Sequence, residues 1–443
     1  MAPYPESRWG NLDSLLKIVT LSQHYAPEPC DLRGHALGRE LVARGHLVTA
    51  LCGLPNYPYG KLYEGYRQRL WTREEMDGVR VFRLPIFPDH SLSTKRRAAH
   101  YLSFAASASI LGPLLCGRAD AMWVYHPPLT VGIPAKWISL LRRVPFVYEI
   151  QDLWPDTLIA SGVAAESRAI RWLEGLAAKV YRAASAIVVQ SPGFRTKLIE
   201  RGVPANKLVF VPNWADEDRF RPVPRDPEVG RAHGLAGRFN VMFAGNMGPA
   251  QALDSVLVAA SLLSDLPDVQ MVLVGDGVSY EQLRAAAAEL SNVRFLGRKP
   301  VEEMAGLYAW ADVLLIHLRD EPLFRITIPG KTMSYLACGR PILCAVAGDA
   351  AQIVSDARAG VLCPPENPEA LAQAIRDLHR MPTEQREELG ANGRSEFLRK
   401  YTKQILVDTY ERLLADVAAR RTIEDGLSNQ SIEPEEATCG PRA

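Results

Sequence analysis

The chain has 443 residues, of which 47% are hydrophobic and 23% are charged. This balance is typical of folded globular proteins, and the length predicts two domains rather than one. The 51 lysine and arginine residues are matched by 50 acidic residues, so the composition gives no indication of a nucleic-acid partner.

Seven cysteines are spread along the chain without a CxxC pair or a histidine at the spacing of metal ligands. Their number is odd, and Cys116 and Cys344 lie inside apolar runs. We therefore expect neither a zinc site nor a disulfide framework, and we predict a reducing, cytoplasmic location.

The first residues contain no basic start followed by a long apolar stretch, so no secretory signal is predicted. The longest apolar window, residues 101–116, falls short of the roughly 18 to 20 residues that a membrane-spanning helix needs. We expect the chain not to cross a membrane.

The first half of the chain predicts a doubly wound α/β domain. An apolar strand at residues 16–21 is followed by an amphipathic helix through Leu37 and Leu41 and by a second strand at 46–52. Alternating strands and helices are typical of a parallel sheet with helices on both faces. Further strands are predicted at 80–84, 121–125, 144–150 and 186–190.

After a turn-rich segment at 211–220, the same alternation begins again. The predicted fold is therefore α/β, with two Rossmann-like domains facing a cleft, where each sheet offers a ligand site at the carboxyl ends of its strands. Such an arrangement suits the transfer of a group between two substrates. The second set of strands is predicted at 239–245, 269–277, 293–296, 313–316, 341–344 and 360–362.

The chain is therefore predicted to have five parts. They are a first domain at 1–210, a hinge at 211–222, a second domain at 223–395, a closing helix at 396–420 that returns to the first domain, and a disordered tail at 421–443.

A glycine-rich turn, GNMG at 245–248, lies between the first strand and the first helix of the second half. Its glycines would let backbone amides approach an anion, and the helix N-terminus would add a favourable dipole. The alternative is a turn that merely links a strand to a helix.

Two cations flank a second turn. Arg325 and Lys331 lie on either side of Pro329 and Gly330, ahead of a predicted helix. Fixed cations there would neutralise the charge of a departing nucleotide diphosphate, so we predict that Arg325 and Lys331 are catalytic. A solvated basic loop is the alternative. Arg298, after the strand at 293–296, would line the same site or cover the strand end.

Polar and aromatic side chains also follow the strands of the first half. Asp152 would accept a hydrogen bond from a substrate and is our third catalytic candidate, while Trp154 would stack on a substrate ring; the alternative is a loop-capping aspartate beside a packed tryptophan. The remaining candidates are Glu149, pointing out from the same strand end, His24 and Glu28 in the loop after the first strand, Tyr57 on the same rim, and His126 at the start of a proline-rich loop. Ordinary loop histidines would explain His24 and His126 equally well.

The order of short motifs along the chain resembles that of the family-4 retaining glycosyltransferases. The resemblance spans about residues 17–415 and rests on RGHLVTALCG, LPNYPYG, YEIQDLWPD, VVQSPG, VPNW, GNMG, VGDG, FLGR and ACGRPIL. Within that family, LPNYPYGKLYEGY and YEIQDLWPDT look most like the branch that adds N-acetylfucosamine-type sugars in O-antigen, capsule or colanic-acid assembly.

This resemblance implies a GT-B fold and a reaction without metal or cofactor, in which a nucleotide sugar, commonly UDP-linked, serves as co-substrate. The anomeric configuration would be retained, with the leaving diphosphate helping to take the acceptor proton. The first domain would bind the acceptor through His24, Glu28, Tyr57, His126, Glu149 and Trp154. The second would bind the donor through Gly245, Asn246, Gly248, Gln251, Asp276, Arg298, Pro329, Gly330 and Ser334.

The sequence departs from the family pattern where charge is usually supplied. Many members carry two glutamates with seven residues between them, and these positions are Ile326 and Ser334 here. The arginine and lysine that often follow the glycine turn are replaced by Asn246 and Gln251. The diphosphate charge would then fall more heavily on Arg325 and Lys331.

Two stretches combine basic and apolar residues, at 92–115 and 135–143. They would rest on an anionic membrane surface, where a polyprenyl-diphosphate-linked saccharide would present the acceptor, so we predict peripheral association with the inner leaflet. The alternative is a pair of helices packed on the first sheet with their basic ends in water.

Three other functions fit parts of the sequence. A nucleotide-sugar 2-epimerase would share the architecture and the donor. A nicotinamide oxidoreductase is disfavoured, because the second strand ends in ALCG at 50–53 without the acidic residue that holds an adenosine ribose. A non-catalytic nucleotide-sugar-binding subunit would explain the missing glutamates.

Overall fold

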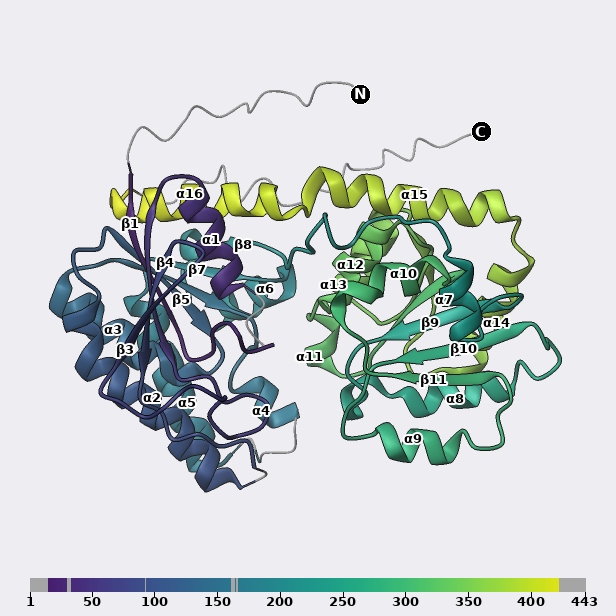
Figure 1. Ribbon diagram of the computed structural model, residues 1–443, viewed down its shortest axis with the longest axis horizontal. Helices are drawn as coiled ribbons and strands as arrows, with labels where there is room; N and C mark the ends of the chain where they lie inside the picture. Colours follow the sequence, from purple (N-terminus) through teal and green to yellow (C-terminus); the bar gives the residue numbers. More distant parts are fainter. Residues whose placement is uncertain (1–14, 30–32, 92, 161–163, 165, 422–443) are drawn as a thin grey trace. The chain divides into compact units, whose positions relative to one another are not determined.

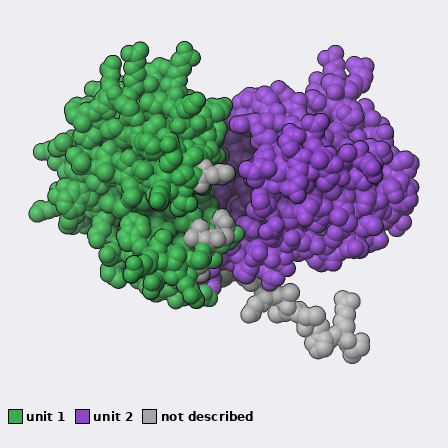
Figure 2. Space-filling view, turned by 90° about the horizontal axis from the view of Figure 1, so that it is seen from below, with its two compact units in different colours: residues 1–189, 199–210, 407–443 green, residues 190–198, 211–406 purple. Residues whose placement is uncertain are grey.

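The computed structural model describes residues 15–29, 33–91, 93–160, 164 and 166–421, and the predicted tail at 421–443 lies outside them except for Arg421. The chain forms two compact units, coloured in Figure 2. Unit 1 comprises Met1–Val189, Ile199–Phe210 and Val407–Ala443, and unit 2 comprises Gln190–Leu198 and Val211–Leu406. Each unit is built on its own sheet.

The sheet of unit 1 has eight strands in the order β3-β4-β2-β1-β5-β6-β7-β8. Every neighbouring pair is parallel except β3 and β4. The central strands are buried along nearly their whole length, as expected for a parallel sheet covered on both faces. The strands are β1 (Lys17–Ser22), β2 (Leu47–Gly53), β3 (Thr72–Met76), β4 (Val79–Leu84), β5 (Ala121–His126), β6 (Phe146–Ile150), β7 (Ala186–Val189) and β8 (Leu208–Phe210).

Helices cover both faces of this sheet, with α2, α3 and α5 on one side and α1 and α16 on the other (Figure 1). The helices in this part of the chain are α1 (Gly34–Ala43), α2 (Thr94–Leu115), α3 (Gly132–Arg142), α4 (Asp156–Ala160), α5 (Arg168–Ala183), α6 (Pro192–Glu200) and α16 (Lys403–Ala418), with short 3-10 turns η1 (Leu129–Val131) and η2 (Ala205–Lys207).

Unit 2 contains six parallel strands in the order β11-β10-β9-β12-β13-β14. Its core lies between this sheet and helices α8 and α14, around Val241, Phe243 and Met271. The strands are β9 (Phe239–Ala244), β10 (Val269–Val274), β11 (Val293–Gly297), β12 (Val313–His317), β13 (Ile342–Ala345) and β14 (Gly360–Leu362). The helices are α7 (Pro227–Ala232), α8 (Leu253–Ser261), α9 (Tyr280–Ala286), α10 (Met304–Ala309), α11 (Pro322–Arg325), α12 (Lys331–Cys338), α13 (Asp349–Asp356), α14 (Pro368–Arg380) and α15 (Thr383–Lys400), with 3-10 turns η3 (Pro249–Gln251) and η4 (Val301–Glu303).

The predicted pair of doubly wound Rossmann-like domains is confirmed, and every predicted strand is present within a few residues of its expected bounds. Two edge strands, β3 and β8, were not predicted. Strand β3 has the polar sequence TREEM and β8 has three residues, so neither carries the apolar run that marks the buried strands.

Helix α2 is longer than the apolar window in the sequence suggested. It has 22 residues and is long and apolar enough, by length and composition alone, to cross a membrane. The expectation that this stretch is too short was therefore wrong. In unit 1, however, α2 packs on β2, β4 and α3, and a Cβ atom built on Gly112 would lie 2.5 Å from Cδ1 of Ile138, so the two helices are in close contact.

A buried polar cluster joins the last helix to the centre of the first sheet. Glu149 on β6 accepts hydrogen bonds from Arg33 Nη1 at 2.7 Å, Trp123 Nε1 at 2.9 Å, Tyr410 Oη at 2.8 Å and Gln151 Nε2 at 2.6 Å. Arg33 also donates to Tyr410. The expectation that Glu149 points out from the strand end was wrong, because its carboxylate is buried, and its hydrogen bond from Tyr410 connects α16 to β6.

Replacing Glu149 should destabilise unit 1. Glu149→Gln removes the negative charge that compensates buried Arg33, so the free energy of unfolding should fall by about 3–5 kcal/mol. Urea denaturation followed by tryptophan fluorescence measures the change. The control is Glu75→Gln on exposed strand β3, for which a change within about 0.5 kcal/mol is expected. Equal stability of the two variants would contradict the role given to Glu149.

Candidate functional site

The carboxyl edge of the unit 2 sheet brings two glycine turns into contact. The turn at 245–248 follows β9, and the loop at 275–277 follows the neighbouring strand β10. A Cβ atom built on Gly275, which has φ +129°, would lie 2.0 Å from the carbonyl oxygen of Gly245. The N–H of Met247 donates to the carbonyl of Asp276 at 2.7 Å. Glycine is therefore required for the two turns to pack this closely.

Most backbone amides of the 245–248 turn already have acceptors. Gly245 donates to Val274 O at 2.9 Å, Met247 to Asp276 O, and Gly248 to Gln251 Oε1 at 3.0 Å. The Gln251 oxygen also accepts from Asn246 Nδ2 at 3.3 Å. The expected free amides are thus largely occupied, and Gln251 Oε1 holds the acceptor position that an anion oxygen would need at Gly248.

Lys331, the first residue of α12, reaches this glycine turn. Its Nζ lies 3.4 Å from the ring centroid of Phe243, and a Cβ atom built on Gly245 would lie 3.0 Å from the same Nζ. The Nζ atom is buried and has no hydrogen-bond partner among the described residues. Burial holds the pKa of Lys331 well below its usual value. A cation desolvated without a counter-charge is costly, and a nearby anion would relieve that cost.

Helix α12 is fixed to the end of β9 by Tyr335. The Tyr335 hydroxyl accepts from Ala244 N at 2.9 Å, so the start of the helix lies directly beside the turn that follows Ala244. Thr332, the residue after Lys331, has a buried hydroxyl that also lacks a partner among the described residues. Thr332 could not be identified from the sequence, since a single threonine at a helix start is common.

His317, at the end of β12, is a second residue that the sequence analysis missed. Its Nδ1 donates to Gln251 O at 2.7 Å, and its Nε2 lies 3.3 Å from Ser255 Oγ. Burial lowers its pKa, so the ring is neutral and suited to this pair of contacts. His317 therefore positions the segment that carries Gln251, between the glycine turn and α8.

The predicted catalytic Arg325 lies on short helix α11 and pairs with Asp320. Its Nε donates to Asp320 Oδ1 at 3.0 Å and its Nη2 to Oδ2 at 3.2 Å. Both side chains are about half exposed, at 57% and 40%. Whereas Lys331 has no counter-charge in the described part of the chain, Arg325 already has one, so the two predicted cations are not equivalent.

The other donor-side candidates fall into two groups. Ser334 is nearly buried on α12 and donates to Lys331 O at 3.0 Å, while Pro329 O accepts from Thr332 N at 2.9 Å next to the helix start at Gly330. These residues shape the first turn of α12. Asp276 and Arg298 are exposed in the loops that follow β10 and β11.

Three acceptor-side candidates of unit 1 lie together after β1 and β2. The rings of His24 and Tyr57 have centroids 5.7 Å apart, and His24 Nδ1 lies 3.2 Å from Glu28 Oε2. Glu28, however, is buried and accepts from the backbone N–H groups of Asn56 and Tyr57 at 2.7 and 2.8 Å. Burial alone would raise its pKa, but the hydrogen bond and charge of His24 outweigh burial and lower it. Glu28 organises the two loops rather than facing a ligand.

His126 and Trp154 lie in the core and not on a rim. His126 is fully buried, both ring nitrogens lack partners among the described residues, and burial lowers its pKa to about 3. Trp154 packs edge-on against His126 and Tyr101, each with ring centroids 5.9 Å apart. The structure thus supports the packed-tryptophan alternative. Asp152 has an exposed side chain, and its carbonyl accepts from Trp154 N at 3.0 Å.

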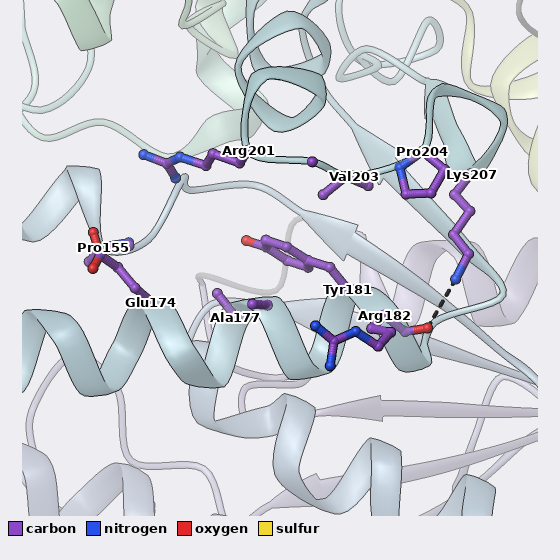
Figure 3. A pocket seen from close by; sticks show the side chains of 11 residues that line it. Pro155, Glu174, Ala177, Tyr181, Arg182, Arg201, Val203, Pro204 and Lys207 are labelled. Carbon is purple, nitrogen blue, oxygen red and sulfur yellow. Dashed lines mark hydrogen bonds between the residues drawn. The ribbon is translucent and has the colours of Figure 1, made fainter.

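A pocket of about 460 Å³ lies elsewhere in unit 1, between α5 and the segment at 201–207 (Figure 3). Tyr181 lies at its centre, and Lys207 donates to the carbonyl of Arg182 at 3.0 Å. None of the predicted site residues lines this pocket. Within the described residues, no group of three or more histidine, cysteine, aspartate or glutamate side chains is arranged to hold a metal ion.

Two family models match the chain. Residues 33–214 match the glycosyl transferase 4-like domain, and residues 238–381 match the glycosyl transferases group 1 domain. The probable glycosyltransferase WbjE of Pseudomonas aeruginosa is 28% identical over 64% of this chain and 69% of its own length. The putative colanic acid biosynthesis glycosyl transferase WcaI of Escherichia coli is 26% identical over 83% of this chain and 93% of its own length.

Among solved structures, Anabaena HepE in complex with UDP and glucose aligns with a TM-score of 0.68 at 17% identity, covering 90% of this chain and 99% of that one. Sucrose-phosphate synthase from Thermosynechococcus elongatus aligns with a TM-score of 0.69, also at 17% identity, covering 91% of this chain and 99% of that one. At this identity the likeness establishes the fold, which is GT-B.

Removing the buried ammonium should stabilise the ligand-free protein. Lys331→Met keeps an apolar stem and should raise the free energy of unfolding at neutral pH by about 1–3 kcal/mol, the cost of an unsatisfied buried polar group. Lys299→Met, in the loop after β11, is the control and should change stability by less than about 0.5 kcal/mol.

The difference in free energy of unfolding between Lys331→Met and the unaltered protein should depend on pH. Between the lowered pKa of folded Lys331 and the 10.5 of an ordinary lysine, the unfolded chain binds more protons than the folded chain. The stability of the unaltered protein relative to Lys331→Met should therefore rise as the pH increases towards 10.5. Urea denaturation across the alkaline range measures this difference, and a constant difference would show that Lys331 is not desolvated.

Proposed function

Since this chain is a GT-B glycosyltransferase of the family-4 type, related to enzymes of polysaccharide synthesis, we propose that unit 2 binds the diphosphate of a nucleotide sugar between the 245–248 turn and Lys331. One observation carries the proposal: the ammonium of Lys331 is buried beside Gly245 without a counter-charge in the described residues. An anion bound at this turn would supply the missing charge.

The surroundings of Lys331 suit a departing nucleotide diphosphate. The helix dipole of α12 adds positive potential at its N-terminus, where Lys331 and the unpartnered Thr332 hydroxyl lie. A phosphate oxygen would replace Gln251 Oε1 as the acceptor for Gly248 N–H. Lys331 would then stabilise the charge that develops on the leaving group as the glycosidic bond to the nucleotide breaks.

We propose UDP as the nucleotide carrier and an amino or deoxy sugar as the transferred group. The motif resemblance to N-acetylfucosamine-type transferases supports this choice, as does the presence of UDP in the complex of the fold neighbour HepE. Ser334, which occupies the place of a family glutamate, is nearly buried on α12, so ribose recognition would fall to other groups near the helix start.

The acceptor in this proposal is a lipid-linked saccharide bound by unit 1. His24 and Tyr57 form the partly exposed part of the site, with Asp152 on the loop after β6 as a hydrogen-bond acceptor for a sugar hydroxyl. Transfer proceeds with retention and without a protein nucleophile, metal or further cofactor. The leaving diphosphate accepts the proton of the acceptor hydroxyl.

We also propose that unit 1 associates peripherally with the inner face of the cytoplasmic membrane. Apolar side chains project from the packed helices α2 and α3, with Ile110 69%, Leu114 76% and Leu140 66% exposed. Exposed basic residues follow Leu140 at the end of α3, namely Arg142 and Arg143, and Lys95 is exposed at the start of α2. Apolar side chains beside basic ones favour binding to anionic lipid surfaces.

The donor proposal predicts specific stabilisation by UDP. A ligand that binds only the native state at about 100 times its Kd raises the free energy of unfolding by about 2.7 kcal/mol, so UDP should raise the Tm of the unaltered protein. Lys331→Met should lose this shift and lower turnover by about two to three orders of magnitude. Lys299→Met should keep both. A shift with GDP or dTDP instead of UDP would assign a different nucleotide.

Release of UDP by the purified protein distinguishes the remaining functions. A transferase should release UDP only when a lipid-linked saccharide is present. Conversion of the UDP-sugar without an acceptor would identify an epimerase, and UDP-sugar binding without turnover under both conditions would identify a binding subunit. Activity that disappears with EDTA and returns with a divalent metal would contradict a metal-free mechanism.

The membrane proposal predicts flotation with anionic vesicles. The unaltered protein should float with phosphatidylglycerol-containing vesicles, while Leu114→Glu/Leu140→Glu should remain in the soluble fraction because the two carboxylates would have to enter the anionic surface. Leu262→Glu on unit 2, at a position with 42% exposure, is the matched control and should float. Failure of the unaltered protein to float would remove the proposal.

A further inference from the structure

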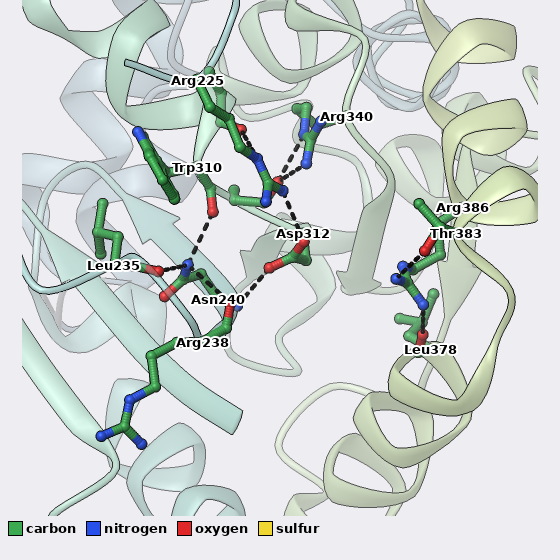
Figure 4. A network of polar contacts seen from close by, with 12 residues as sticks. Arg225, Leu235, Arg238, Asn240, Trp310, Asp312, Arg340, Leu378, Thr383 and Arg386 are labelled. Atoms are coloured by element: carbon green, nitrogen blue, oxygen red, sulfur yellow. Dashed lines mark hydrogen bonds and ion pairs between the residues drawn. The ribbon is translucent and has the colours of Figure 1, made fainter. Parts of the chain in front are cut away.

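A second polar cavity lies at the opposite edge of the unit 2 sheet from the glycine turns. It has a volume of about 820 Å³ and lies where β12 and β13 begin, against helix α15. Four arginines from three segments of the chain line it, two of them on α15, together with two carboxylates. The arginines are Arg225, Arg340, Arg386 and Arg394, and the carboxylates are those of Asp312 and Glu387. Figure 4 shows Arg225 and Arg340 beside Asp312, with Arg386 on α15.

The negative charge of Asp312 is already engaged. Its Oδ1 accepts from Arg225 Nη2 at 2.8 Å, and its Oδ2 accepts from the backbone N–H of Asn240 at 2.8 Å. Arg340 and Arg386 have no ion-pair partner among the described residues. Arg340 Nε donates to Ala311 O at 2.6 Å, and Arg386 Nη1 to Leu378 O at 3.1 Å, so both bind neutral backbone oxygens.

The arginines therefore carry more positive charge than the cavity carboxylates can balance. Even without Arg394, the three guanidinium groups of Arg225, Arg340 and Arg386 outnumber the two cavity carboxylates, so the lining carries an excess of positive charge. Burial, and then the charge of Arg225, lowers the pKa of Arg340, as expected for a guanidinium that is desolvated among like charges. A bound anion would remove this repulsion.

The cavity also retains unused donors. Arg225 Nη1 and Arg340 Nη1 make no hydrogen bond to any described residue, and guanidinium groups bind phosphate with two parallel hydrogen bonds. Pro222, Pro341 and Leu398 add apolar wall for an organic portion. The volume falls within the range of about 300–1,000 Å³ that is usual for small-molecule sites.

From the charge, the free donors and the volume, we infer that this cavity binds a phosphorylated small molecule, with the phosphoryl group between Arg225, Arg340 and Arg386. The negative charge of a phosphoryl group complements this excess of positive charge. The site is separate from the proposed donor site, because strand β9, of six residues, runs from one edge of the sheet to the other and spans about 20 Å.

Ala391 gives a test that leaves every arginine in place. It lies exposed on α15 in the cavity lining, where glutamate and glutamine are both good helix formers. Ala391→Glu would place a carboxylate among the arginines, and Ala391→Gln is its neutral control of the same size. Both are made in the Lys331→Met background, which removes the cation of the proposed donor site.

The probe is inorganic pyrophosphate at constant ionic strength, followed by thermal shift and calorimetry. Pyrophosphate should bind the Lys331→Met protein and its Ala391→Gln form equally, and it should bind the Ala391→Glu form at least about tenfold more weakly. The Ala391→Glu form should also have the higher Tm without ligand. Equal pyrophosphate binding by the two Ala391 variants, or no binding by either, would overturn the inference. UDP binding by the protein that retains Lys331 is measured separately. Its absence would contradict the donor proposal without affecting the result for this cavity.

Discussion

An ammonium group that is buried with no counter-charge in the described part of the chain is the constraint around which the carboxyl edge of unit 2 is arranged. Lys331 keeps this position because α12 begins beside Gly245, and α12 begins there because Tyr335 binds the backbone of Ala244. A side chain at Gly245 would meet the ammonium, and one at Gly275 would meet the backbone of the neighbouring turn. The two glycines and the tyrosine thus maintain one geometry, which desolvates a cation at the place where we propose that the donor diphosphate binds.

The unit 2 sheet has positively charged side chains at both edges, but the surroundings of these side chains differ. Lys331 lies against an aromatic ring without a hydrogen bond in the described structure, so its environment favours a single strong interaction with a ligand. Arg340 and Arg386 are anchored to carbonyl oxygens, and only part of each guanidinium remains available. The first arrangement suits charge that develops during a reaction, while the second suits binding of a stable anion.

The fold was largely predictable because buried parallel strands are continuous apolar runs, and the sequence separates these runs with helical patterns. The strands that escaped prediction, β3 and β8, lie at the two ends of the unit 1 sheet and have little apolar surface to bury. The sequence allowed the glycine turn and Lys331 to be assigned to the same site. The turn directly follows strand β9, Lys331 begins helix α12, and both lie at the carboxyl edge of the unit 2 sheet. The donor-binding roles of all these residues, including the exposed Asp276 and Arg298, remain predictions.

Errors in the site prediction came from polar residues that the fold turns inward. Glu149 and Glu28 follow the expected pattern of strand-end carboxylates, but their partners come from distant parts of the chain, as Tyr410 lies 261 positions from Glu149. His126 and Trp154 are similar in that packing, and not local sequence, decides their environment. His317 and Thr332 were missed for the opposite reason, because neither belongs to a recognisable motif.

The position of α16 has a consequence for how the protein is made. Arg33 and Glu149 are synthesised early, but Tyr410, which binds both, emerges from the ribosome only after all of unit 2 has been translated. Until then, a buried ion pair in the nascent first unit lacks one of its hydrogen-bonding partners. Most of unit 2 is effectively an insertion within unit 1, so a helix synthesised after unit 2 completes the domain that was begun first.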